Sequence, residues 1–202
     1  MKLKKMLGFG ILANIIMATI FSLYSYGNNK VVATVSTVEI NYKNVEDLAT
    51  KAPLVIKGKV VDIKEVEKVV YDNAKGEDED FDEIIYTNKV FKVEKVYKGS
   101  DVKSGDEILV RILEGEIDDV VQHSEFTVSE GESYVLFLKP SVYPKKDGAY
   151  AIEGGAQGIF EIKNKSNKNN ISSQEIKVVN EKYKEIESLD ELESTLENSL
   201  NN

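Results

Sequence analysis

The 202-residue chain contains no cysteine. This absence excludes disulfide bonds, thiolate metal ligands, a thiol nucleophile and a lipid-modified cysteine at a processed N-terminus. Histidine occurs once, as His123, and Arg111 is the single arginine among 26 basic residues. We interpret the preference for lysine over arginine as coding bias. With 42% hydrophobic residues, a chain of this length can bury a core without covalent cross-links.

Acidic residues outnumber basic residues by 35 to 26, so the formal net charge is −9. Residues 1–27 carry three lysines and no acid, so the remainder of the chain carries −12. Segment 72–83 accounts for −6 of this charge and segment 181–197 for −5, which leaves the rest close to neutral. Most nucleic-acid affinity comes from cationic contacts to phosphates, and the sequence contains no basic stripe to supply them. We therefore expect no nucleic-acid partner.

The N-terminus has the pattern of a secretory signal peptide. Three lysines within residues 2–5 precede an uncharged apolar run at 6–23. Small residues favour cleavage after Gly27, with Ala33 as a second candidate. The alternative is an uncleaved anchor, since the run approaches the roughly 20 residues that span a bilayer. Both interpretations predict a secreted or extracytoplasmic surface domain, attached to a membrane only through the leader if that is uncleaved.

The first regular elements after the leader are a short helix and a long strand. Asn44 supplies an N-cap and Pro53 ends the predicted helix between them. The stretch 54–68, LVIKGKVVDIKEVEK, alternates apolar and polar residues, which predicts a strand. The doubled Val60-Val61 shifts this alternation and predicts a β-bulge that bends the strand.

Further strands are predicted in consecutive order along the chain. The segments VVY at 69–71 and IIY at 84–86 mirror each other across the acidic loop, which predicts that they pair. Residues 114–131 have no strong period and form a longer connection with room for a short helical turn. The other strands are expected at 89–98, 107–113, 132–139 and 150–162, the last split by a glycine-rich segment.

The C-terminal region begins with a polar linker at 164–170. Residues 175–179 fit either a sixth strand or a helix. Ser188 and Glu191 form a capping-box pattern at the start of a final helix, in which leucines recur at helical spacing at 189, 192, 196 and 200. We favour docking of this helix on the rest of the protein over pairing with a partner.

These elements predict a mainly β fold, a five-stranded OB-like barrel with a short N-terminal helix and a C-terminal helix. The expected domains are a signal peptide at 1–27, a barrel domain at 28–163 with its core at 44–162, and the linker and acidic helix at 164–202. Within 44–162 the segments VYKG at 96–99 and GESYVLFL at 131–138 resemble secreted bacterial proteins with netrin-like or tissue-metalloproteinase-inhibitor-like OB domains. The resemblance implies fold rather than activity, because the cysteines of the animal inhibitors are absent.

Two groups of residues are candidate binding sites. The acidic loop offers hard oxygen ligands suited to Ca²⁺, against the alternative of a solvated charged loop. Tyrosines near the barrel are candidates for a binding surface, against the alternative of core packing or cross-strand pairing. The calcium candidates are Asp72, Glu77, Asp78, Glu79, Asp80 and Asp82, and the tyrosines are Tyr71, Tyr86 and Tyr97.

The favoured functional hypothesis is a non-catalytic module that binds a protein or carbohydrate of the cell envelope or medium, with no cofactor other than calcium. A second hypothesis is a hydrolase that uses Glu116, Asp118 and Asp119, which requires a clustered, buried pair of carboxyl groups. A third hypothesis, protease inhibition, rests on analogy of fold alone. His123 is expected to be a surface residue.

Overall fold

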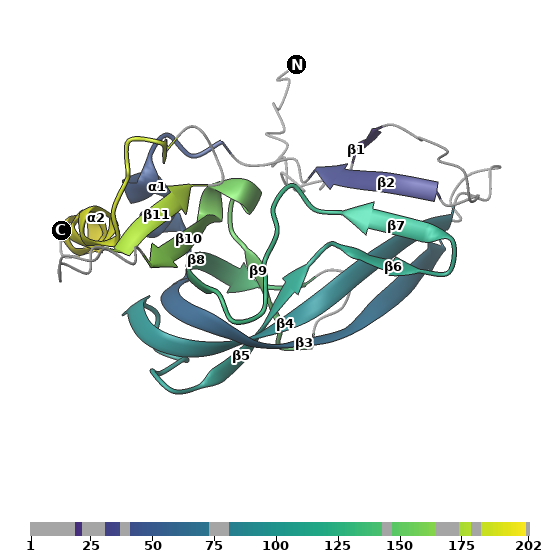
Figure 1. Cartoon of the computed structure of the whole chain (residues 1–202), viewed down its shortest axis with the longest axis horizontal. Helices are drawn as coiled ribbons and strands as arrows, with labels where there is room; N and C mark the ends of the chain where they lie inside the picture. Colours follow the sequence, from purple (N-terminus) through teal and green to yellow (C-terminus); the bar gives the residue numbers. More distant parts are fainter. Residues whose placement is uncertain are drawn as a thin grey trace, which may run out of the picture.

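The described part of the chain is mainly β, with two α-helices, as the sequence predicts (Figure 1). The N-terminal strand β1 (Thr19–Phe21) lies within the predicted leader. The rest of that leader, the acidic residues 73–80 and the linker residues 165–173 lie outside the described ranges. No helix within those ranges is long and apolar enough to cross a membrane. The computed structural model describes residues 19–21, 31–36, 41–72, 81–142, 147–164, 174–178 and 183–200.

A long hairpin of β3 (Leu54–Asp72) and β4 (Phe81–Lys98) forms the centre of the fold (Figure 1). The mirrored apolar segments pair across it, with Val69 opposite Ile84, which confirms the predicted pairing. The register shifts between Val60 and Asp62, which confirms the predicted bulge. This irregularity and the neighbouring ones allow β3 to bend. Its first part pairs with both β4 and β8, whereas its later part pairs with β4 alone.

Five strands close into a ring. From β4 the ring continues through β5 (Glu107–Ile112), β9 (Tyr150–Ile152) and β8 (Ser133–Pro140), and β8 pairs back onto β3. The β5–β9 contact is parallel and the other contacts are antiparallel. The ring therefore leaves none of these five strands without a neighbour on either side.

The predicted interruption of the last strand is confirmed. Strand β9 pairs with the C-terminal half of β8, the 3₁₀-helix η1 (Gly155–Gly158) follows, and β10 (Ile159–Asn164) pairs with the N-terminal half of the same strand. Strand β11 (Gln174–Val178) then adds to β10, which decides between the two interpretations of 175–179 in favour of a strand. The large sheet thus has seven strands within the described residues, two more than predicted for a simple barrel.

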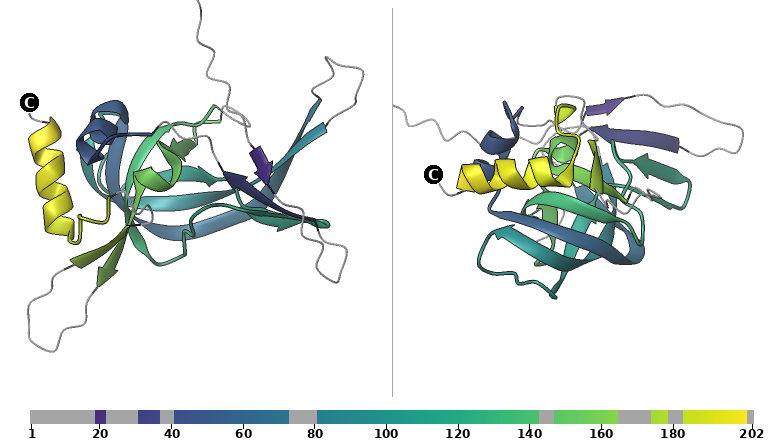
Figure 2. Two further views of the ribbon diagram at one scale, coloured as in Figure 1. Left: turned by 90° about the horizontal axis from the view of Figure 1, so that it is seen from above. Right: turned by 60° about the vertical axis from the view of Figure 1, so that its left-hand side comes forward.

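Strands β3 and β8 are apolar on both faces because they separate two cores. Inside the ring lie Leu54 and Ile56 of β3 with Leu136 and Leu138 of β8. On the opposite face Val55, Val135 and Phe137 pack against the helices α1 (Val45–Lys51) and α2 (Leu189–Leu200). Figure 2 shows both helices at one end of the molecule, away from the small sheet that contains β1.

Both predicted helices begin at the predicted caps. The Asp47 backbone N–H donates to Asn44 Oδ1 at 2.9 Å, and the Glu191 backbone N–H donates to Ser188 Oγ at 3.2 Å. Three of the helical leucines of α2, at 189, 192 and 196, are buried in the helix-side core. Docking of the C-terminal helix is therefore confirmed.

The connection after β5 differs from the prediction, because it forms a β-hairpin instead of a helical turn. Strands β6 (Gly115–Ile117) and β7 (Val120–His123) pair with each other, and β2 (Val31–Ser36) adds to β7 in parallel. The buried Gln122 side-chain amide exchanges hydrogen bonds with the backbone N–H and C=O of Ile85, which attaches this hairpin to β4. Because a single side-chain amide makes this attachment, the sequence shows no periodic pattern that would predict the hairpin.

Substitution of Gly158 tests the close approach that splits the last strand. A Cβ atom at this position would lie 2.0 Å from the Glu153 carbonyl oxygen, a backbone atom that cannot rotate away. We expect Gly158→Ala to reduce the free energy of unfolding by about 2–3 kcal/mol, as overpacking does. Urea unfolding followed by circular dichroism measures this loss.

The matched control is Gly105→Ala. Gly105 has φ +93° but no atom within 4 Å of the added Cβ, so only the backbone cost of about 1 kcal/mol applies. Equal losses in the two variants would contradict a steric role for Gly158.

Candidate functional site

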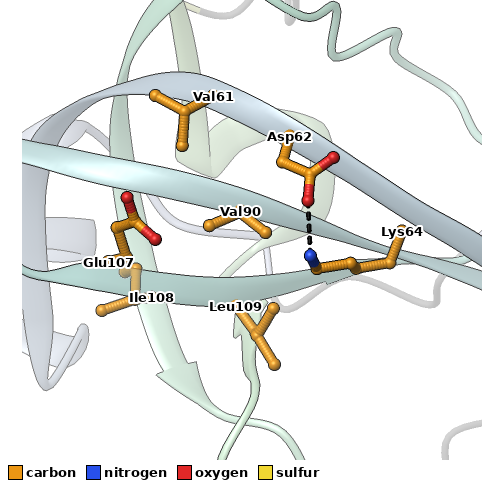
Figure 3. A pocket seen from close by; sticks show the side chains of 7 residues that line it. All are labelled: Val61, Asp62, Lys64, Val90, Glu107, Ile108 and Leu109. Atoms are coloured by element: carbon orange, nitrogen blue, oxygen red, sulfur yellow. Dashed lines mark hydrogen bonds and ion pairs between the residues drawn. The ribbon is translucent and has the colours of Figure 1, made fainter.

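A shallow depression of about 370 Å³ lies on the outer face of the ring, across β3, β4 and β5 (Figure 3). Strand β3 contributes Val61, Asp62 and Lys64, and β4 contributes Val90 in the middle. Strand β5 contributes residues 107–109 on the far side. The floor is aliphatic and the charged side chains stand at its margins (Figure 3).

The register of the three strands explains this arrangement. Val60, Phe91 and Ile108 are aligned across the strands and point into the ring core. The next aligned row is Asp62, Val90 and Leu109, which faces the other way. Because the bulge adds one residue to β3 at this row, Val61 is left 36% exposed beside the depression.

One ion pair lies at the margin of the depression. Lys64 Nζ donates to Asp62 Oδ2, and this hydrogen bond lowers the pKa of Asp62 and raises the pKa of Lys64 (Figure 3). Both side chains are about half exposed, so solvent screens the pair and it contributes little to stability. Its effect is to keep one charge of each sign fixed beside an apolar floor.

The sheet continues from the depression into a buried polar network around Arg111. The side chain of Arg111 is 1% exposed, and its Nη2 donates to both carboxylate oxygens of Asp147, at 2.8 and 2.6 Å. Its Nε donates to Asn88 Oδ1 at 3.2 Å, and the guanidinium lies 4.6 Å from the ring centre of Tyr86. The planar guanidinium can satisfy all of these partners at once, which a lysine ammonium cannot.

The network also connects β3 and the segment after β8. Glu67 on β3 accepts hydrogen bonds from the Tyr86 hydroxyl at 2.7 Å and from Asn88 Nδ2 at 3.1 Å. Arg111 Nη1 donates to Ser141 Oγ at 3.2 Å. The only arginine of the protein therefore lies at the centre of a network that joins β3, β4 and β5 with Ser141 and Asp147. The rarity of arginine, which we interpreted as coding bias, gave no indication of this structural role.

The three candidate tyrosines do not form one surface. Tyr86 is fully buried in the Arg111 network, which fits the alternative of core packing. Tyr97 is partly buried against the helix-side core, and its hydroxyl donates to Glu193 of α2. The backbone of Tyr71 lies in β3, opposite Asp82, and its side chain is outside the described set.

The calcium prediction remains a prediction. Glu77, Asp78, Glu79 and Asp80 lie outside the described residues, as do the side chains of Asp72 and Asp82. Within the described ranges no group of three or more histidine or acidic side chains is placed to hold a metal ion.

The carboxylates of the hydrolase hypothesis are not gathered into a buried pair. Glu116, Asp118 and Asp119 are exposed, and Asp118 forms an ion pair with Lys68 at 2.9 Å. His123 is also exposed, at the end of β7. This geometry lacks the buried, closely spaced carboxyl groups that the hypothesis requires.

No family model and no curated protein matches this chain.

Replacement of Arg111 tests the importance of the buried network. Arg111→Lys keeps the charge but loses the forked contact to Asp147 and leaves buried acceptors without a donor. We expect a loss of about 3 kcal/mol in the free energy of unfolding. Lys64→Gln, which removes the exposed ion pair on the same sheet, should cause no measurable change. Similar stability of the two variants would show that the network is dispensable.

The contact between Tyr97 and Glu193 predicts a pH dependence. Burial raises the pKa of Glu193, but hydrogen bonds from the Tyr97 hydroxyl and Lys95 outweigh it, so the pKa is lowered from 4.5. A lowered folded-state pKa adds stability above pH 4.5 that is lost as the pH falls through the folded value.

The stability difference between the wild type and Glu193→Gln should therefore shrink as the pH falls from 6 to 3. Denaturant unfolding across this range measures the difference. Glu185→Gln, an exposed acid just before the same helix, is the control and should show no such trend. A constant difference for Glu193→Gln would contradict the account.

Proposed function

We propose that this protein is a secreted, non-catalytic binding module whose ring of strands is an OB-like barrel. The lysine-rich start and apolar run of residues 1–23 support secretion. The closed order of β3, β4, β5, β9 and β8 supports an OB-like arrangement, in which five strands wind around one apolar core.

The position of the depression is the observation on which the proposal rests. OB barrels bind their ligands on the face of the second and third strands, and in this ring those strands are β4 and β5. Val90 and Leu109 lie on that face, on the side away from the ring core. A hollow that combines exposed aliphatic side chains with charged side chains at its margins has the mixed composition of a protein-binding surface.

The lining of the depression favours a protein partner over a carbohydrate. Sugar rings pack well on flat aromatic side chains, whereas all apolar residues of this lining are aliphatic. Aliphatic side chains of a partner polypeptide can interdigitate with Val61, Val90 and Leu109 and bury area at about 25 cal/mol per Å². The proposed partner is therefore a protein of the cell envelope or medium.

Site-directed photo-crosslinking tests the proposal. p-Benzoylphenylalanine at position 61 should capture a saturable partner from the envelope or medium of the producing cell. The same probe at Val142, an exposed valine outside the depression, is the matched control and should not capture it. Excess unlabelled wild-type protein should compete with the capture, and excess Leu109→Asp should not.

Identical capture from positions 61 and 142 would contradict the proposal. Competition by Leu109→Asp as strong as by the wild type would also contradict it, because the partner would then not depend on the aliphatic floor. Circular dichroism of each variant establishes that it is folded before the comparison.

A further inference from the structure

A pair of lysines stands beside the depression, one row along the same face of the sheet. Lys59 of β3 and Lys92 of β4 are directly opposite each other in the register, and both are exposed. The row continues with Ser133 of β8 next to Lys59 and Glu107 of β5 next to Lys92. The row that follows on this face is the floor of the depression, with Val90 two residues from Lys92.

This lysine pair lacks the neutralisation that nearby lysines have. Lys57 Nζ forms an ion pair with Glu94 Oε2 at 3.7 Å, and Lys95 Nζ forms one with Glu193 Oε1 at 3.2 Å. Among the described residues, no carboxylate lies within ion-pair distance of Lys59 or Lys92, although the chain as a whole has a net charge of −9. Like charges that face each other across two strands destabilise a sheet. The two ammonium groups therefore repel each other in the folded protein, and Glu107, opposite Lys92 on β5, offsets this repulsion only in part because it forms no ion pair with either lysine.

We propose that Lys59 and Lys92 bind the carboxylate of an extended segment of the partner, whose aliphatic side chain enters the depression. This inference rests on the proposed function and specifies its ligand: an acidic residue, then an aliphatic residue two positions further. The carboxylate would neutralise both lysines at once, which converts their mutual repulsion into attraction for the partner.

The spacing of the two rows fits such a segment. Alternate residues of a strand lie on one face and are about 7 Å apart, because each residue advances about 3.3 Å. An extended segment that runs along the strands therefore places side chains i and i+2 over the lysine row and over the Asp62–Val90–Leu109 row, beside Val61. Glu107 repels a carboxylate at the β5 end of the lysine row and restricts it to β3 and β4.

A peptide titration followed by NMR tests this inference. The probe is a short synthetic peptide that alternates glutamate and valine at every second position, with serine between them, and its partner probe has glutamine for glutamate. At low salt we expect the glutamate peptide to shift the amide signals of residues 59–62, 90–92 and 107–109. The glutamine peptide should bind at least about tenfold more weakly, and added salt should weaken the glutamate peptide further.

Charge variants locate the contact. The double variant Lys59→Glu with Lys92→Glu should lose at least about tenfold in affinity for the glutamate peptide. The matched control, Lys103→Glu with Lys184→Glu, makes the same charge change at two exposed lysines elsewhere and should stay within about twofold. Glu107→Gln should bind more tightly than the wild type.

Stability separates a binding role from a structural one. The single variant Lys59→Glu places opposite charges across β3 and β4, with the neutral Ser133 on its other side, so its melting temperature should be equal to or above that of the wild type while peptide binding falls. Loss of binding together with loss of folding would overturn the inference. Equal binding of the two peptides, equal binding by the double lysine variant, or no shift with either peptide at millimolar concentration would overturn it as well.

The experiments distinguish failure of the lysine inference from failure of the proposed function. If crosslinking at position 61 remains saturable and the double lysine variant still competes like the wild type, the lysine inference is wrong and the proposed function is supported. If crosslinking at position 61 is not saturable, the proposed function itself fails.

Discussion

The fold depends on one wall of two strands that is apolar on both faces. Residues 54–59 of β3 pair with β8, and the side chains of this paired part alternate between the ring core and the core beneath α1 and α2. The hydrophobic effect therefore holds the wall from both sides, and neither the ring nor the helix layer can form without it. The register irregularities of β3 bend the strand, so that its first part belongs to this wall and its later part, with Val66, packs against Gly115 of the β6–β7 hairpin. Neither of the two described helices covers the outer face of β3, β4 and β5, where the depression lies.

Local signals in the sequence predicted the elements well, because they depend on neighbouring residues. Asn44 and Ser188 identified the helix starts through caps, and the alternation and bulge of 54–68 identified the bent strand. The β-hairpin at 115–123 was missed because its attachment comes from Gln122, whose hydrogen bonds join residues 37 positions apart. The large sheet has two strands more than the predicted barrel, because the predicted split strand forms both β9 and β10, and because the sequence pattern of β11 fitted a strand and a helix equally well until its pairing with β10 decided between them.

The candidate site was harder to predict than the fold, because it is created by register between distant strands. The sequence analysis directed attention to tyrosines and to acidic runs, which are conspicuous in composition. The structure instead brings together ordinary valine, leucine and lysine residues from three strands. Arg111 was conspicuous only as an exception, and its role follows from the carboxylate of Asp147, which lies 36 residues away. A single arginine in a lysine-rich sequence can therefore indicate a site that needs the planar, forked guanidinium, which lysine cannot replace.

We propose that the outer face of β3, β4 and β5 is a binding surface. Amide hydrogen exchange of the protein, with and without the partner captured at position 61, tests it most directly, because it surveys every described strand at once. The account predicts slower exchange within 59–64, 90–92 and 107–109 in the complex, with α1 and α2 unchanged. Protection confined to the helices or to the β6–β7 hairpin, with unchanged exchange on the β3–β5 face, would contradict it.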